Sequence, residues 1–185
     1  MIYLCVAFKE EAKPLLQQWQ FQRDKAAPCT LYYTDNIYLC ITRMGHAKAQ
    51  EALTALLTYR PPQTGDCFIN FGICAAPDSF AIGEVLHCSH LFYNDRLLTL
   101  SSPATCHLRT VDTPCATPHA TPVDMEAFFL FQTALAHFSR CFCIKVVSDH
   151  FQPEAVCIRT LKTLLHNGVT ILKEIIHENC CCHRC

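Results

Sequence analysis

The feature that most constrains this fold is the alternation of short apolar segments with longer helical ones. The short segments are rich in β-branched and aromatic residues and are bounded by polar or turn-forming residues, which is typical of buried strands. They cover residues 2–8, 30–36, 37–44, 66–74, 83–94, 107–114 and 141–150. Helices are expected over residues 10–19, 46–59, 125–138 and 153–178. This alternation predicts an α/β fold, which we expect to have three α/β/α layers around a central mixed, mostly parallel sheet.

The length of the chain predicts how these elements are grouped. A chain of 185 residues can bury a substantial core as one unit, and no repeat or linker divides it. We therefore expect a single domain over residues 1–179. The cysteine-rich end, residues 180–185, is expected to be a disordered tail.

Composition and charge exclude several classes of protein. Hydrophobic residues make up 51% of the chain, which argues against an intrinsically disordered protein. The net charge is −1 and Lys and Arg are scattered singly, so we expect no nucleic-acid partner. No apolar run approaches the ~20 residues that span a bilayer, and the N-terminus does not read as a signal peptide. We expect no membrane partner and a cytoplasmic location.

The cysteines predict buried thiols rather than disulfides. There are fifteen of them, an odd number, and most lie inside apolar segments, where cysteine acts as a small hydrophobe. The tail at 180–185 holds four Cys and one His, which are residue types that bind zinc. Neighbouring cysteines point in divergent directions and no second paired cluster has the spacing of a zinc finger. We therefore expect no metal and no cofactor, and zinc binding by the tail stays the alternative.

Three acidic residues stand where predicted strands end or predicted helices begin. Glu11 follows the first strand, Glu126 opens an almost wholly apolar helix, and Asp149 closes the last strand. Each position has a structural explanation, because acids in the first turn of a helix are stabilised by its dipole. Asp124 is a further candidate to cap the helix after it. Ligands of α/β sheets bind at the carboxyl ends of the strands, so we expect the three acids to share one site.

The segments that hold these acids carry a family resemblance. "VDMEA" (123–127), "FINFGICAAP" (68–77), "KVVSDH" (145–150) and "AFKEEAKPLL" (7–16) resemble segments of 5′-methylthioadenosine/S-adenosylhomocysteine nucleosidases. The matches run in order through nearly the whole chain. The resemblance implies a short member of the purine nucleoside phosphorylase/hydrolase superfamily, with that superfamily's fold. The futalosine or aminodeoxyfutalosine hydrolase type is one candidate within it.

The resemblance also implies roles for individual residues. Asp149 would be the general acid that protonates the purine, and Ser148 would orient its carboxyl group. Glu126 would bind the ribose hydroxyls beside the backbone of Met125, and Glu11 would activate the attacking water. Further substrate contacts are implied for Lys145, which stands where the family has arginine, and for Ile73, Cys74, Ala75, Pro114 and Cys115.

The chemistry of glycosidic cleavage calls for the same residue types. Cleavage passes through a sugar cation, so an acid must improve the leaving base and carboxylates must tolerate the positive charge. The general acid Asp149 would need a raised pKa, which burial supplies. Glu126 should stay ionised at its helix N-terminus.

The resemblance and the charge pattern leave the exact reaction and substrate open. A phosphorylase needs glycine-rich loops and cations for phosphate, and the acidic "AFKEE" segment disfavours these, so hydrolysis is favoured. A phosphorylase and a non-catalytic nucleoside-binding protein remain the alternatives. Candidate substrates are methylthioadenosine, S-adenosylhomocysteine, futalosine and aminodeoxyfutalosine, as in methionine salvage or menaquinone biosynthesis. The resemblance further implies a homodimer whose partner closes the 5′ pocket.

Overall fold

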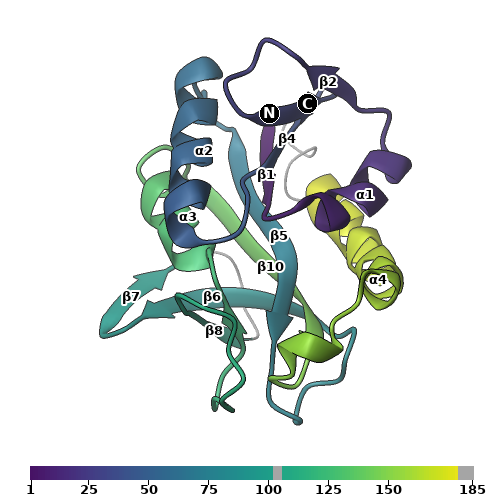
Figure 1. The fold of residues 1–185 in the computed structure, drawn as a ribbon. Coiled ribbons are helices and arrows are strands. Elements are labelled where there is room, and N and C mark those ends of the chain that lie inside the picture. The colour runs from purple at the N-terminus through teal and green to yellow at the C-terminus, as the bar shows by residue number, and fades with distance from the viewer. Residues whose placement is uncertain (102–105, 179–185) are drawn as a thin grey trace.

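The computed structural model describes residues 1–101 and 106–178, and in these ranges helices follow strands much as expected (Figure 1). The strands are β1 (Ile2–Val6), β2 (Gln22–Asp24), β3 (Thr30–Tyr33), β4 (Ile37–Ile41), β5 (Cys67–Ala75), β6 (Val85–Tyr93), β7 (Arg96–Thr99), β8 (Cys106–Thr110), β9 (Val123–Asp124) and β10 (Arg140–Asp149). The helices are α1 (Lys9–Gln18), α2 (His46–Tyr59), α3 (Ala127–Ala134) and α4 (Ile158–Ile176), with a short 3-10 turn (Pro153–Ala155) before α4.

The strands form a mixed sheet, but the expectation of a mostly parallel one is not confirmed. The order is β10-β6-β8-β9-β5-β1-β4-β3-β2, with β7 on β6. Five of the described pairings are parallel and five are antiparallel. β10 also pairs with β5, so β5, β10, β6, β8 and β9 close into a small barrel instead of a flat layer.

Irregularities in two strands accompany this closure. The register of β10 shifts between Val147 and Asp149, and that of β6 shifts between Cys88 and His90. Bulges of this kind bend a strand and increase its twist, which lets a sheet curl back on itself. The bulge in β10 lies directly before Asp149, at the end of the strand.

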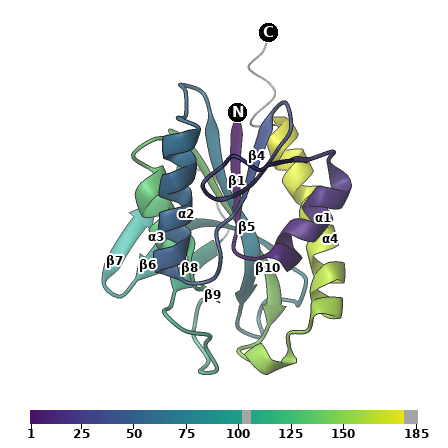
Figure 2. The same cartoon turned by 45° about the horizontal axis from the view of Figure 1, so that its top comes forward.

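Two pairs of helices flank the strands (Figures 1 and 2). α1 and α4 pack on each other and on one side of the sheet, where Leu15, Leu165 and Leu172 are buried. α2 and α3 lie on the other side, and Leu53 and Phe131 belong to the second core cluster. The apolar sequence of α3 predicted its burial, which is confirmed.

A glycine allows α4 to approach the sheet closely. A Cβ atom on Gly168 would lie 2.6 Å from Cγ2 of Val146 and 3.0 Å from Cζ of Phe71. Only a residue without a side chain fits this crossing. α4 runs through Gly168 as one helix, so this glycine serves close packing.

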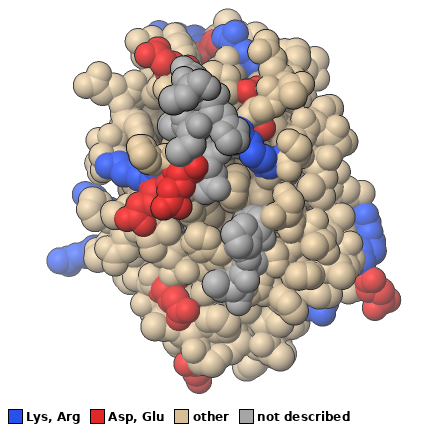
Figure 3. Space-filling view, turned by 180° about the vertical axis from the view of Figure 1, so that it is seen from behind, with Lys and Arg blue, Asp and Glu red and all other residues tan. Residues whose placement is uncertain are grey.

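The remaining expectations about the chain as a whole concern its tail and surface. The cysteine-rich tail at 180–185 lies outside the described residues. Among the helices that the structure describes, none has the length and apolarity required to cross a membrane. On the face shown in Figure 3, the visible Lys and Arg side chains lie at separate points on a mostly uncharged surface.

Candidate active site

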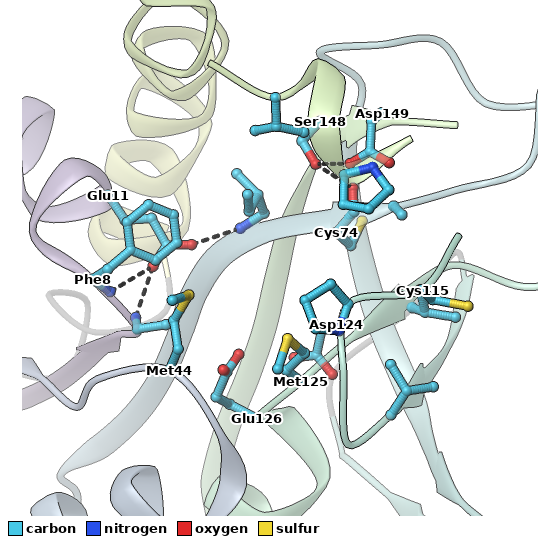
Figure 4. Close-up of a pocket in the computed structure, with 18 of the residues that line it drawn as sticks. Phe8, Glu11, Met44, Cys74, Cys115, Asp124, Met125, Glu126, Ser148 and Asp149 are labelled. Carbon is cyan, nitrogen blue, oxygen red and sulfur yellow. Dashed lines mark hydrogen bonds between the residues drawn. The ribbon is translucent and has the colours of Figure 1, made fainter. Parts of the chain in front are cut away.

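A cavity of about 270 Å³ opens where β1, β5 and β10 end, and it brings the three predicted acids together (Figure 4). Four of its lining residues are acidic, and none of the described residues that line it is Lys or Arg. The lining residues are Ala7, Phe8, Glu11, Met44, Ile73, Cys74, Ala75, Val111, Pro114, Cys115, Val123, Asp124, Met125, Glu126, Ser148, Asp149, Pro153, Val156 and Leu161.

Glu11 lies in the first turn of α1, and its carboxylate is surrounded by backbone donors. Oε2 accepts hydrogen bonds from the N–H groups of Ala7 at 2.7 Å and Phe8 at 3.2 Å. Oε1 accepts a third from Ile73 N–H on β5 at 2.9 Å. Burial raises the pKa of Glu11 to about 7, although Lys145 and the three backbone donors act in the opposite direction. A carboxyl group with this pKa can accept a proton near neutral pH.

Gly72 on β5 leaves the space that Glu11 occupies. A Cβ atom at this position would lie 2.6 Å from Oε1 of Glu11, which is shorter than real contacts allow. The requirement is therefore steric and does not concern backbone freedom. A glycine inside a strand pattern often marks such a close approach, so the sequence carried a signal that our sequence analysis did not use.

Glu126 begins α3 and points toward the middle of the cavity (Figure 4). Its Oε1 accepts a hydrogen bond from the N–H group of Gly45 at 2.7 Å, across from the loop before α2. Burial and the neighbouring Asp124 raise the pKa of Glu126 to about 7, while the Gly45 hydrogen bond and Lys145 lower it. Burial therefore opposes the ionised state that we expected for Glu126 at this helix N-terminus.

Asp149 lies at the end of β10 with Ser148 beside it. Its Oδ1 accepts the N–H group of Gln152 at 2.8 Å, and Oδ2 lies 2.7 Å from Oγ of Ser148. The same Ser148 hydroxyl lies 3.0 Å from the carbonyl oxygen of Cys74, which can only accept. A hydroxyl has one proton to donate. That proton can be directed to the carbonyl of Cys74 or to the carboxylate of Asp149.

Lys145 is the one predicted site residue that does not line the cavity. Its Nζ pairs with Oδ2 of Asp124 at 2.8 Å, and the two side chains are only 2% and 1% exposed. A direct contact with substrate, as predicted, does not agree with this position. The physical reason is that the positive charge of a fully buried ammonium must be compensated. The carboxylate of Asp124 on β9 compensates it and holds Lys145 away from the cavity.

The other predicted residues lie in the wall of the cavity, and their roles remain predictions. Ile73, Cys74 and Ala75 follow one another on β5, and the Sγ atom of Cys115 donates to the carbonyl of Thr117 at 3.0 Å. Met125 and Pro114 complete this set. The sequence analysis did not foresee the further apolar residues of the wall, which are Ala7, Phe8, Met44, Val111, Val123, Pro153, Val156 and Leu161.

Comparisons with known proteins identify the fold that carries this site. No family model matches the sequence, and no curated protein matches it. Among solved structures, the 5′-methylthioadenosine/S-adenosylhomocysteine nucleosidase of S. pneumoniae, with a transition-state inhibitor, is 17% identical. It superposes with a TM-score of 0.77, over 92% of this chain and 96% of that one.

Two further structures agree with it. The 5′-methylthioadenosine nucleosidase of Arabidopsis thaliana is 18% identical, with a TM-score of 0.78 over 96% of both chains. A futalosine hydrolase mutant of Helicobacter pylori is 13% identical, with a TM-score of 0.80 over 96% of this chain and 98% of that chain. At these identities the likeness establishes the fold, and the chain therefore has the fold that these nucleosidases share with futalosine hydrolase.

Proposed function

We propose that this protein hydrolyses the N-glycosidic bond of adenine nucleosides with a 5′ substituent and releases the free base. The observation that carries the proposal is the convergence of Glu11, Glu126 and Asp149 on one cavity from three separate parts of the chain. Such a set of carboxyl groups supplies an acid, a base and a partner for a sugar cation. The shared fold supports the same reaction.

Asp149 acts as the general acid in this proposal. It transfers a proton to N7 of the purine, so that the bond between C1′ and N9 breaks and the base leaves as a neutral molecule. The Ser148 hydroxyl supports this role, because it can donate to Cys74 and accept from a protonated Asp149. After the proton has left, the hydroxyl can turn and donate to the new carboxylate.

Glu126 and Glu11 act on the sugar and on water. Glu126 accepts hydrogen bonds from the ribose hydroxyls, and its negative charge stabilises the cation that develops at C1′. Glu11 removes a proton from a water molecule whose oxygen forms the new bond to C1′. Its three backbone donors hold the carboxylate in one orientation for this step.

The charges around the cavity favour water over phosphate as the nucleophile. Phosphate binding calls for cationic side chains or free backbone donors. The described lining has four acids and no Lys or Arg, and the nearby ammonium of Lys145 is committed to Asp124. The backbone donors around Glu11 are likewise occupied. A phosphate group would meet repulsion at this end of the cavity.

The apolar wall suggests where the 5′ substituent lies and why a partner subunit matters. Phe8 and Met44 line the cavity near Glu11, away from the side of Asp149 (Figure 4). Met44 is a large apolar side chain that lines the cavity and is nevertheless 60% exposed. We propose a homodimer whose second subunit covers this rim. The 5′ substituent that the pocket accepts would assign the protein either to methionine salvage or to menaquinone biosynthesis.

Product analysis tests the proposed reaction. Purified protein is incubated with methylthioadenosine, S-adenosylhomocysteine, futalosine and aminodeoxyfutalosine, each with and without inorganic phosphate. We expect free base and free sugar from at least one nucleoside, at a rate that does not depend on phosphate. Sugar 1-phosphate that forms only with phosphate would identify a phosphorylase. Tight nucleoside binding without any release of base would identify a binding protein.

A further inference from the structure

Asp124 in the cavity lining and Lys145 behind it form a completely buried ion pair. Nζ of Lys145 on β10 lies 2.8 Å from Oδ2 of Asp124 on β9. Oδ2 also accepts the N–H group of Ala127 at 2.9 Å, and Oδ1 accepts the hydroxyl of Thr110 at 2.7 Å. Both oxygens of Asp124 are therefore occupied. A buried pair that is so fully bonded has a single well-defined geometry.

This pair is connected to the start of α3, where Glu126 is located. Asp124 binds the N–H group of Ala127, the residue after Glu126. Oγ1 of Thr110, itself donating to Asp124, accepts the N–H group of Phe128 at 3.0 Å. Two of the first amide groups of the helix are held in this way. The backbone of Glu126 is consequently fixed between the strand that carries Asp124 and the first turn of α3.

The same pair also determines the electrostatic environment of the catalytic carboxylates. The ammonium of Lys145 interacts electrostatically with three carboxyl groups: Asp124 on β9, Glu126 at the start of α3 and Glu11 on α1. It also interacts with two thiols, those of Cys143 on β10 and Cys74 on β5. The ammonium lowers the pKa of both Glu11 and Glu126, whereas Asp124 raises the pKa of Glu126. The two members of the pair thus act on Glu126 in opposite directions.

We propose that Asp124 and Lys145 are a positioning pair for the reaction: they fix the start of α3 beneath Glu126, and their opposite charges act in opposite directions on that carboxyl group. Neither residue needs to touch the substrate for this role. The inference rests on the proposed hydrolysis for its kinetic consequences, while its electrostatic part concerns the protein alone.

Four variants separate this role from a merely structural one. Lys145→Met removes the cation, Asp124→Asn removes the anion, and the double variant Lys145→Met/Asp124→Asn removes both charges. Lys145→Arg keeps the cation and is the matched control. For each folded variant, kcat and kcat/KM of base release are measured from pH 5 to pH 9, with the nucleoside that the wild type cleaves fastest.

The acidic limb of the pH profile is the decisive measurement. Without Lys145 we expect the limb to move to higher pH by about 1 unit, since an adjacent opposite charge shifts a pKa by that order. Without Asp124 we expect it to move to lower pH. In the double variant the two displacements cancel, and in Lys145→Arg the limb stays in place. Two results overturn the proposal. One is a loss of activity in all variants without any movement of the acidic limb. The other is movement of the limb in the same direction in both single variants.

A measurement without turnover distinguishes failure of this inference from failure of the proposed hydrolysis. The side-chain carboxyl of Glu126 is titrated by ¹³C nuclear magnetic resonance in the same variants, with Glu126→Gln to assign the signal. If the wild type cleaves no nucleoside, the hydrolysis is wrong, but opposite displacements of this titration still support the pair. If the Glu126 titration is unchanged in all three of these variants (the double variant, Lys145→Met and Asp124→Asn), the proposed role of the pair is rejected. The double variant also protects the test against unfolding, because it leaves no unpaired buried charge.

Discussion

The two ends of the cavity hold carboxyl groups in contrasting surroundings. At one end, the hydrogen-bond partners of Glu11 among the described residues are all donors, namely the N–H groups of Ala7, Phe8 and Ile73. At the other end, Asp149 meets one N–H group and a hydroxyl that has a second acceptor within reach. Backbone N–H groups can only donate a hydrogen bond, whereas a hydroxyl can donate one or accept one.

This difference explains how two similar groups can do opposite work. The surroundings of Glu11 suit a carboxylate that receives a proton from water. Those of Asp149 suit a carboxyl group that alternates between holding and losing a proton, since Ser148 can follow each state. The proposed base and the proposed acid therefore differ mainly in the hydrogen-bond partners that surround each carboxyl group, and less in whether the residue is Asp or Glu.

Substitution of Asp149, the proposed general acid, should lower turnover the most. Asn at position 149 has no proton to transfer, so we expect Asp149→Asn to lower kcat by about 10³-fold to 10⁴-fold while nucleoside affinity is retained. Steady-state kinetics and calorimetric binding measure the two quantities. The matched control is Asp78→Asn, which alters a carboxylate that is 93% exposed. Near-normal turnover by Asp149→Asn would show that Asp149 is not the general acid.

Removal of the base end should have a slightly smaller effect. Glu11→Gln cannot accept a proton from water, and we expect kcat to fall by about 10²-fold to 10³-fold with little change in affinity. The neighbouring Glu10→Gln serves as the control, because Glu10 pairs with Lys13 at the surface. The comparison of the two ends fails if Glu11→Gln retains most of the wild-type rate.

Burial of Glu11 should also be visible in stability. The pKa of Glu11 is raised from 4.5 to about 7, so the folded state holds its proton more tightly than the unfolded state does. The stabilisation by this proton is complete below about pH 4.5 and is lost as the pH rises through about 7. Relative to Glu11→Gln, the wild type should lose about 3 kcal/mol of unfolding free energy over this range. Urea unfolding of both proteins at pH 4.5 and pH 8 measures the difference, and parallel pH dependences would contradict it.

The smallest expected effect concerns the glycine beside Glu11. The methyl group of Gly72→Ala would collide with Oε1 of Glu11, so the carboxylate must shift, and we expect kcat to fall by about 10-fold. The same substitution in a Glu11→Gln background tests the cause. If Gly72 acts through Glu11, the double variant should be little slower than Glu11→Gln alone, because coupled effects are not additive. Independent, multiplying losses would show that Gly72 matters for another reason.

Much of the local structure could be predicted because it depends on neighbouring residues. The helix α2 (His46–Tyr59) matches its predicted range, since an alanine- and leucine-rich segment ends at Pro61 and Pro62. The hairpin of β3 and β4 follows from alternating residues on either side of Asp35 and Asn36. The barrel could not be foreseen, because the pairing of β10 with both β5 and β6 joins strands far apart in the chain.

The candidate site shows the same division between local and distant contacts. The sequence by itself determined which acids stand at the ends of strands and starts of helices, since strand and helix periodicity is a local property. Only the tertiary structure decided which atoms meet there: Gly45 with Glu126, Gly72 with Glu11, and Lys145 with Asp124. The reason is physical, because burial and hydrogen bonding depend on the distance between atoms in space, and these pairs are separated by 81, 61 and 21 residues along the chain.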